Sequence, residues 1–267
     1  LNIARNPDSD QQDGTLVLHG SEGLDLQSVH IDGQLISTDD YSRDSDSLTI
    51  NNLPDSCVVI TEVLIKPQLN TTMMGLYRSR TMYCTQCEAE GFRDITYYLD
   101  RPDVMSEFTT KVIADKDTYP VLLSNGNPTE RGDLDGGKHF VTWHDPFKKP
   151  AYLFALVAGT LAVVEDSFTT ISGRHVKLQI FVEEKDLDKC AHAMLSLKNS
   201  MRWDEQTYGR EYDLDIFMIV AVDDFNMGAM ENKGLNIFNT SAVLANPKTT
   251  TDAAFQRVEA IVAHEYF

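Results

Sequence analysis

The chain lacks a hydrophobic run long enough to cross a membrane, and it lacks any excess of positive charge. A membrane-spanning helix needs about 20 apolar residues. The longest apolar stretch here, residues 151–164, is interrupted by Gly159 and Thr160, and we interpret it as a buried strand. The chain holds 23 Lys and Arg against 41 Asp and Glu, a net charge of −18. Because such a surface repels nucleic-acid phosphates and anionic lipid, we expect neither a nucleic-acid partner nor a membrane.

Cysteine is also scarce: Cys57, Cys84, Cys87 and Cys190 are too few for a disulfide framework in 267 residues. We predict free thiols in a reducing compartment, and therefore a cytoplasmic protein. Cys84 and Cys87 have the C-x-x-C spacing of a redox site or of half a zinc knuckle. A redox pair needs a strand-to-helix turn and a knuckle needs a second Cys/His pair, so we favour a structural pair of thiols. The sequence starts at Leu1 rather than Met, and we expect that an upstream segment has been removed.

Apolar residues make up 42% of the chain, enough for a proper core. The first part of the sequence alternates in short runs separated by turn residues, which is typical of an antiparallel all-β domain over residues 1–160. The predicted strands are 15–19, 29–31, 47–50, 58–65, 95–99, 107–114, 121–124 and 138–143, with a hairpin loop at 133–137.

The pattern changes after residue 160, where strands and helices alternate. We predict strands over 175–182 and 214–222 and helices over 186–202 and 253–267, the second capped by Thr251 or Asp252. Residues 161–267 therefore indicate the first part of a mixed α/β domain.

The chain ends in His264-Glu265-Tyr266-Phe267. In the helical motif H-E-x-x-H, two histidines at i and i+4 bind one Zn²⁺, and the Glu is a general base for water. The second His would be the next residue after Phe267. Taken alone, a His-Glu pair at this place is more often a solvated part of a helix than a metal site.

Residues 226–239 combine two glycines with Glu231. The simplest interpretation is a polar turn between two strands. Alternatively, an exposed strand edge could pair with an extended peptide, and the Glu231 carboxylate could hold the ammonium group at its start. That arrangement would make an exopeptidase site.

Three segments together resemble the aminopeptidase N family of zinc peptidases. Gly228-Ala229-Met230-Glu231-Asn232 is followed, 32 residues after Asn232, by His264-Glu265, like the paired signature of that family. Gln86–Arg93 resembles the family segment that reaches from the N-terminal β domain into the active site. Lys233 stands where many animal members have Trp, which with the Gln86 segment indicates the bacterial branch.

The resemblance implies a fold that is mainly β with α+β: an N-terminal antiparallel β-sandwich or saddle domain, then the start of a thermolysin-like α/β catalytic domain. It implies one zinc ion per complete catalytic domain, with His264 as first ligand and Glu265 as general base. The third ligand and an oxyanion-stabilising Tyr would lie outside this sequence. The substrate-binding residues that it implies are Gln86, Glu88, Met227, Gly228, Ala229, Met230, Glu231 and Asn232.

We therefore expect a metallo-aminopeptidase that removes single residues from peptides with a free N-terminus, acting as a monomer, and we expect this chain alone to be inactive. Two alternatives stay open. The chain could be a non-catalytic peptide-binding module, or it could come from a related zinc hydrolase, such as an epoxide hydrolase with a secondary aminopeptidase activity. The Gln86 segment and Lys233 disfavour the hydrolase.

Overall fold

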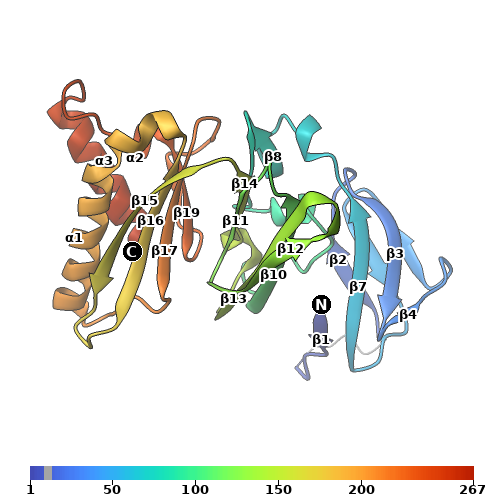
Figure 1. Ribbon diagram of the computed structural model, residues 1–267. Coiled ribbons are helices and arrows are strands. Elements are labelled where there is room, and N and C mark those ends of the chain that lie inside the picture. Colours follow the sequence, from blue (N-terminus) through green and yellow to red (C-terminus); the bar gives the residue numbers. More distant parts are fainter. Residues whose placement is uncertain (9–13) are drawn as a thin grey trace. The chain divides into compact units, whose positions relative to one another are not determined.

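A computed structural model describes residues 1–8 and 14–267 and shows a mainly β protein whose described α-helices all lie in its last third (Figure 1). The helices are α1 (Ala191–Tyr208), α2 (Thr240–Val243) and α3 (Asp252–Tyr266). The strands up to the first long hairpin are β1 (Asn2–Ala4), β2 (Leu16–His19), β3 (Asp25–Ile31), β4 (Gln34–Leu35), β5 (Tyr41–Arg43), β6 (Ser47–Ile50), β7 (Ser56–Leu64), β8 (Gly75–Ser79) and β9 (Met82–Gln86). The later strands are β10 (Ser106–Asp115), β11 (Val121–Ser124), β12 (Asn127–Leu134), β13 (Lys138–Lys149), β14 (Leu156–Gly159), β15 (Ala162–Thr169), β16 (His175–Val182), β17 (Ile216–Val222), β18 (Ala229–Met230) and β19 (Leu235–Asn239).

The chain divides into two compact units. Unit 1 comprises residues 1–77, 86–105 and 150–152, and unit 2 comprises residues 78–85, 106–149 and 153–267. Unit 1 is built from two small antiparallel sheets, β1-β7-β3-β4 and β2-β6-β5. Alternate residues of both sheets face a shared core, as Val59 of β7 and Leu48 of β6 do. This is sandwich packing, in which inward-facing apolar side chains alternate with outward-facing ones.

Unit 2 contains a mixed five-stranded sheet in the order β15-β16-β17-β19-β18. β16, β17 and β19 run parallel, whereas β15 and β18 pair antiparallel at the two edges. Every residue of β17 is buried, as expected for a central strand that is covered on both faces. Antiparallel sheets precede it, with β13 between β10 and β12, and with β11 and β9 flanking β14.

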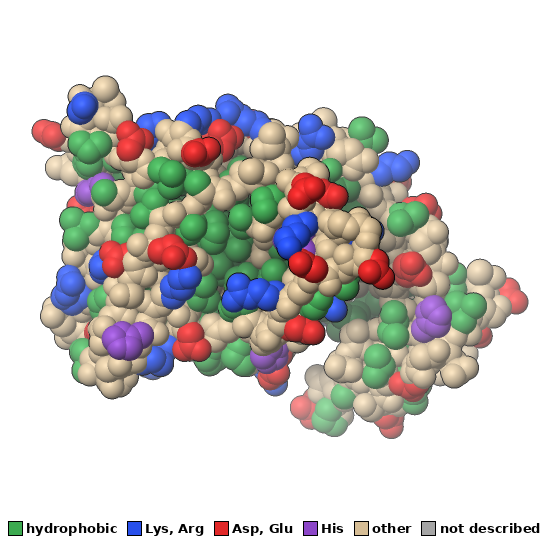
Figure 2. Space-filling model, viewed as in Figure 1, with side chains coloured by type: hydrophobic (Ala, Val, Ile, Leu, Met, Phe, Trp, Pro, Cys, Tyr) green, Lys and Arg blue, Asp and Glu red, His purple; other side chains and the backbone are tan. Residues whose placement is uncertain are grey.

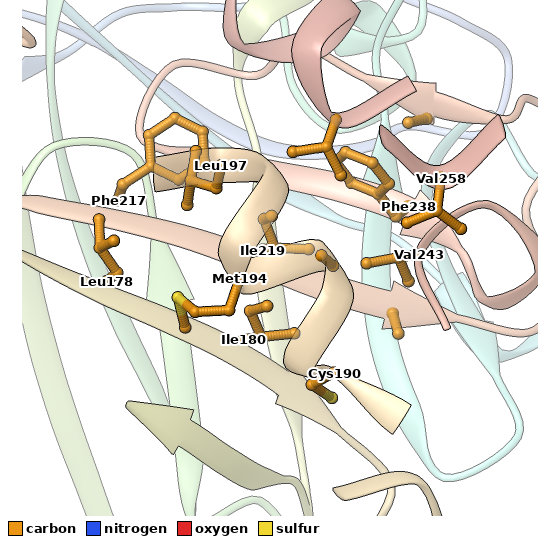
Figure 3. Close-up of a cluster of buried hydrophobic side chains, with 14 of the residues drawn as sticks. Leu178, Ile180, Cys190, Met194, Leu197, Phe217, Ile219, Phe238, Val243 and Val258 are labelled. Atoms are coloured by element: carbon orange, nitrogen blue, oxygen red, sulfur yellow. The ribbon is translucent and has the colours of Figure 1, made fainter. Parts of the chain in front are cut away.

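Helices α1 and α3 pack on one face of the five-stranded sheet. Figure 3 shows Met194 and Leu197 of α1 beside Leu178 of β16 and Phe217 of β17. Val258 and Val262 of α3 join the same core. The packing of α3 on this core fixes the orientation of its last turn, which carries His264 and Glu265.

The predicted fold class is confirmed: antiparallel β structure comes first, and the α/β region with the helices follows it. The strands predicted at 47–50, 121–124 and 175–182 have these bounds in the structure. α3 starts at Asp252 with Thr251 as N-cap, whose side chain accepts from the Ala254 N–H. The division into two units does not test the domain boundary at residue 160, which stays a prediction.

Three predictions of single elements are wrong. Residues 95–99 form no strand, because a 3₁₀ turn at 92–94 runs into this segment and only Tyr98 bridges to His19. Residues 151–164 are not one buried strand, because Thr160 and Leu161 separate β14 from β15, which belong to different sheets. The helix predicted over 186–202 starts at Ala191 and ends at Tyr208, where Gly209 adopts a left-handed conformation; the acidic residues before it form a 3₁₀ helix.

Charges of both signs lie side by side over much of the face shown in Figure 2, so the acidic excess is interspersed with basic side chains on this face. Within residues 1–8 and 14–267, no helix is long and apolar enough to span a membrane. The four cysteines are buried and free, as predicted.

Candidate active site

A pocket of about 270 Å³ in unit 2 is lined by both Glu231 and Glu265. These residues stand 34 positions apart in the sequence, one after strand β18 and the other in the last turn of α3. The rest of the lining is formed by Leu153, Asp204, Glu211, Tyr212, Asp213, Phe217, Lys233, Gly234, Asn236, Tyr266 and Phe267. The structure therefore brings the two predicted functional carboxylates to one cavity.

Glu231 reaches the pocket because β18 forms an antiparallel hairpin with β19. Met230 pairs with Ile237, and the Leu235 N–H donates to the Asn232 carbonyl 3.1 Å away. Met230 and Asn232 are fully buried, whereas Glu231 between them is exposed. The alternation of side chains along an extended segment thus turns one carboxylate towards solvent between two buried neighbours.

Glu265 is presented by α3, whose apolar stripe packs on the sheet. The side chain of Glu265 is 8% exposed, whereas His264 beside it is exposed. Glu265 lies three residues after the buried Val262 and therefore on the same face of α3. His264 points about 100° away from Glu265, and its side chain is therefore in different surroundings. The pocket lining includes Glu265 and does not include His264.

Aromatic rings form one wall of the pocket. Tyr212 contacts both Phe217 and Tyr266, with ring centroids 5.2 Å and 6.3 Å apart. Burial raises the pKa of Tyr212, and the nearby Asp213 carboxylate adds to the shift. Burial raises the pKa of Tyr266 as well, with Asp204 adding to it. Both phenols therefore stay protonated at neutral pH, and their rings shield this side of the pocket from water.

Lys233 contributes a positive charge to a lining that otherwise holds several carboxylates. Its ammonium donates to both oxygens of Asp213 at 2.7 Å and lies 4.6 Å from the centroid of the Phe147 ring. The pocket lining thus contains the Lys233–Asp213 ion pair together with the Glu231 carboxylate, and the Phe147 ring contacts Lys233 from outside that lining.

The other predicted site residues divide between the two units. Ala229 and Met230 are the buried residues of β18, and Met227 and Gly228 precede them as exposed residues. The Gly228 carbonyl accepts from the Asn239 N–H at 2.9 Å, which holds the start of the hairpin. Gln86, at the end of β9, and Glu88 belong to unit 1, so their contribution to the pocket stays a prediction.

The sequence analysis predicted only Glu231 and Glu265 of the lining as site residues, and Tyr212, Asp213, Lys233 and Asn236 are among those that it did not predict. Of these four, only Asn236 could have been noticed in the sequence, because a polar residue within the apolar run of β19 is unusual for a buried strand. Tyr212 and Asp213 lie in an acidic segment before β17 that has no periodic pattern, and only the fold brings them to Glu231.

The metal prediction has one prospective ligand in this chain, the His264 imidazole. Among the described residues, no group of three or more His, Cys, Asp or Glu side chains is arranged to hold a metal ion. His139 and His144 lie on β13 and bond to Tyr119 and Thr109. An exposed imidazole next to a largely buried carboxylate fits the first part of the H-E-x-x-H motif.

Comparison with known proteins places the chain in a family. The profile of the peptidase M1 N-terminal domain matches residues 4–153, and that of the peptidase family M1 domain matches residues 192–267. The chain belongs to the M1 peptidase family. Within this M1 chain, the first match ends in the segment before β14. The second starts at the second residue of α1 and contains β18, β19 and α3. The pocket lined by Glu231 and Glu265 therefore lies mostly in the segment that matches the family M1 domain.

Named relatives agree with this assignment. This M1 chain is 58% identical to "Aminopeptidase N" of Caulobacter vibrioides over 94% of its length and 56% identical to "Aminopeptidase N" of Escherichia coli over 96%. It spans 29% of the length of each of these relatives. A solved structure, Legionella pneumophila aminopeptidase A in complex with aspartic acid, matches with a TM-score of 0.94 and 38% identity, covering 100% of this chain and 31% of that one.

Proposed function

We propose that this chain is the amine-binding part of a zinc aminopeptidase that releases single residues from the N-terminus of peptides. The observation that carries the proposal is the common pocket of Glu231 and Glu265. One carboxylate suits a cationic group at the start of a peptide, and the other suits proton transfer at the bond that follows.

Glu231 binds the α-ammonium group of the substrate. It is exposed at the end of β18, which is the edge strand of the five-stranded sheet. An edge strand can hold an extended peptide through backbone hydrogen bonds, here at Gly228, Ala229 and Met230. A charge-assisted hydrogen bond to the ammonium then fixes where the peptide begins, so that only its first residue is released.

Glu265 takes a proton from the attacking water and passes it to the leaving amine. Its partial burial within an aromatic-walled pocket keeps bulk water from competing for that proton. His264 would be the ligand that this chain supplies to zinc. When bound, zinc would polarise the scissile carbonyl and lower the pKa of water at the site.

The remaining sites extend the same proposal. Met227 would contribute to recognition of the first side chain, and Asn232 holds the hairpin. Roles of Gln86 and Glu88, which belong to unit 1, in recognising the first side chain and the amine stay predictions from the family resemblance. Because the aminopeptidase relatives are about three times longer than this chain, we propose that further zinc ligands lie in a longer protein and that the isolated chain is inactive. The buried free thiols suit a cytoplasmic protein, and we propose that it acts as a monomer.

Hydrolysis of a leucine anilide by the full-length protein tests the function. The zinc-loaded enzyme should release the aniline from leucine anilide but not from its N-acetyl derivative, which has no α-ammonium group. Equal rates on the two compounds would overturn the aminopeptidase proposal. The isolated chain of residues 1–267 is the matched negative control.

A further inference from the structure

The turn that presents Glu231 is held by hydrogen bonds within the hairpin and to distant parts of unit 2. The Asn232 amide donates to the Phe154 carbonyl at 3.3 Å, and the Asn236 amide donates back to the Asn232 carbonyl at 3.0 Å. Both asparagines are nearly fully buried, with exposed fractions of 0% and 3%. An exposed carboxylate is thus attached to a turn whose neighbouring residues are fixed in the interior.

Asn125, which is 3% exposed, makes the longest-range connection to this turn. Its amide donates to the Lys233 carbonyl at 2.8 Å and to the Leu153 carbonyl at 3.0 Å, while its oxygen accepts from the Ala155 N–H at 2.7 Å. The amide group therefore uses three hydrogen bonds to tie residues 153–155 to the residue two positions after Glu231.

Two glycine turns make this approach possible. Gly126, directly after Asn125, has φ +89°, and a Cβ there would lie 2.2 Å from the His144 carbonyl oxygen. Gly234, directly after Lys233, has φ +75°, and a Cβ there would lie 2.8 Å from Leu214 and 3.4 Å from the Gly126 nitrogen. The two turns are therefore packed closely against each other, in conformations that favour glycine.

We infer that Asn125 is a positioning residue for Glu231, acting through the Lys233 carbonyl. The inference rests on the proposed function of Glu231. A carboxylate that recognises an ammonium group must be held to within a fraction of an ångström by its supporting residues. Glu231 itself is exposed, and buried Asn125 ties its turn to the core of unit 2. The Lys233–Asp213 ion pair supports the same turn from the pocket side.

A double-mutant cycle in the full-length protein tests the inference, with a leucine anilide as substrate. Asn125→Ala should raise KM about tenfold and change kcat much less, because a misplaced carboxylate weakens binding of the amine. In the Glu231→Ala background, Asn125→Ala should change KM less than twofold, because its effect passes through the missing carboxylate.

Asn127→Ala is the matched control. Asn127 also joins distant segments, but its amide and its oxygen are both bonded to Asp215, at 3.1 Å, and not to the Glu231 turn. We expect the KM of the Asn127→Ala variant to stay within twofold of the KM of the unsubstituted protein. If Asn125→Ala does not fold, Asn125→Asp keeps the acceptor for Ala155 and replaces the amide that donates to Lys233, and it should raise KM in the same way.

The outcomes separate the two proposals. If Glu231→Ala raises KM but the effect of Asn125→Ala adds to it in full, the positioning role is overturned and the amine-binding role stands. If Glu231→Ala leaves KM unchanged, the amine-binding role falls, and the positioning role falls with it. An equal rise in KM for Asn127→Ala would show a general loss of structure, which also overturns the positioning role.

Discussion

The turn after β18 and the last turn of α3 both reach the same pocket, yet they are held in different ways. Around Glu231, the neighbours Asn232 and Asn236 are buried. The Asn232 amide donates to the distant Phe154 carbonyl, and the Asn236 amide donates to the Asn232 carbonyl within the hairpin. Around Glu265, His264 is exposed and Phe267 is 60% exposed, resting on the Trp203 ring with centroids 5.1 Å apart. The turn that carries Glu231 is therefore held by hydrogen bonds of buried side chains, whereas His264, the proposed metal ligand, is an exposed side chain of α3.

The largest effect should come from the helix side of the pocket. Replacing the general base in the full-length enzyme, Glu265→Ala, should lower kcat by about 10²- to 10⁴-fold. The zinc content should stay the same, because Glu265 is not proposed as a ligand. Steady-state kinetics with metal analysis of the same sample measures both. A variant with unchanged kcat would remove Glu265 from the mechanism.

The next largest effect should come from substitutions in the hydrophobic core on which α3 and the β18–β19 hairpin pack. Leu197→Ala should lower the free energy of unfolding by about 2–5 kcal/mol, because Leu197 is fully buried between α1 and the sheet. Chemical denaturation measures the loss. Leu195→Ala is the matched control, since Leu195 lies on the same helix but is 55% exposed. Equal losses for the two variants would contradict the assigned core face of α1.

The same core predicts a dependence of stability on pH. Burial raises the pKa of the Cys190 thiol to about 11, from 9.0. The unfolded thiol ionises first, so stability is intact below pH 9 and falls as pH rises from about 9 to about 11, by about 2–3 kcal/mol for this group. Denaturation of the protein and of its Cys190→Ala variant should show a shallower loss for the variant. Parallel curves would contradict the shifted pKa.

The smallest effect concerns the start of α3. Thr251→Ala should cost about 0.5–2 kcal/mol of stability, because the Thr251 hydroxyl accepts from the Ala254 N–H. Hydrogen exchange should become faster along the first turn of α3 and stay unchanged in the β18–β19 hairpin. Thr249→Ala, at an exposed position nearby, is the control. Equal acceleration in both regions would show that they are not held independently.

Much of this architecture follows from patterns that act over a few residues. The alternation in 175–182 and the apolar run of β17 predict their strands, and Thr251 predicts the start of α3. The errors occur where long-range packing decides. Leu195 is apolar but 55% exposed, because the sheet determines which side of α1 is covered. Leu187 is 39% exposed, because the predicted helix does not extend to it and it lies in the preceding 3₁₀ helix.

The candidate site shows the same limit. His264, Glu265 and Glu231 can be singled out from motifs, since their chemistry depends on neighbouring residues in the sequence. Asn125 cannot be found in this way, because its partner Lys233 is 108 residues away. Asp213 becomes part of the pocket only because β17 and β19 are adjacent and parallel.

The most direct test of the account is the binding of an amine at Glu231. In the full-length protein made inactive by Glu265→Ala, calorimetry can compare leucinamide with 4-methylpentanamide, which is the same amide without the amino group. We predict that leucinamide binds about 10- to 100-fold more tightly, the value of a hydrogen bond to a charged group, and that adding Glu231→Gln removes this preference. A preference that survives Glu231→Gln unchanged would contradict the account.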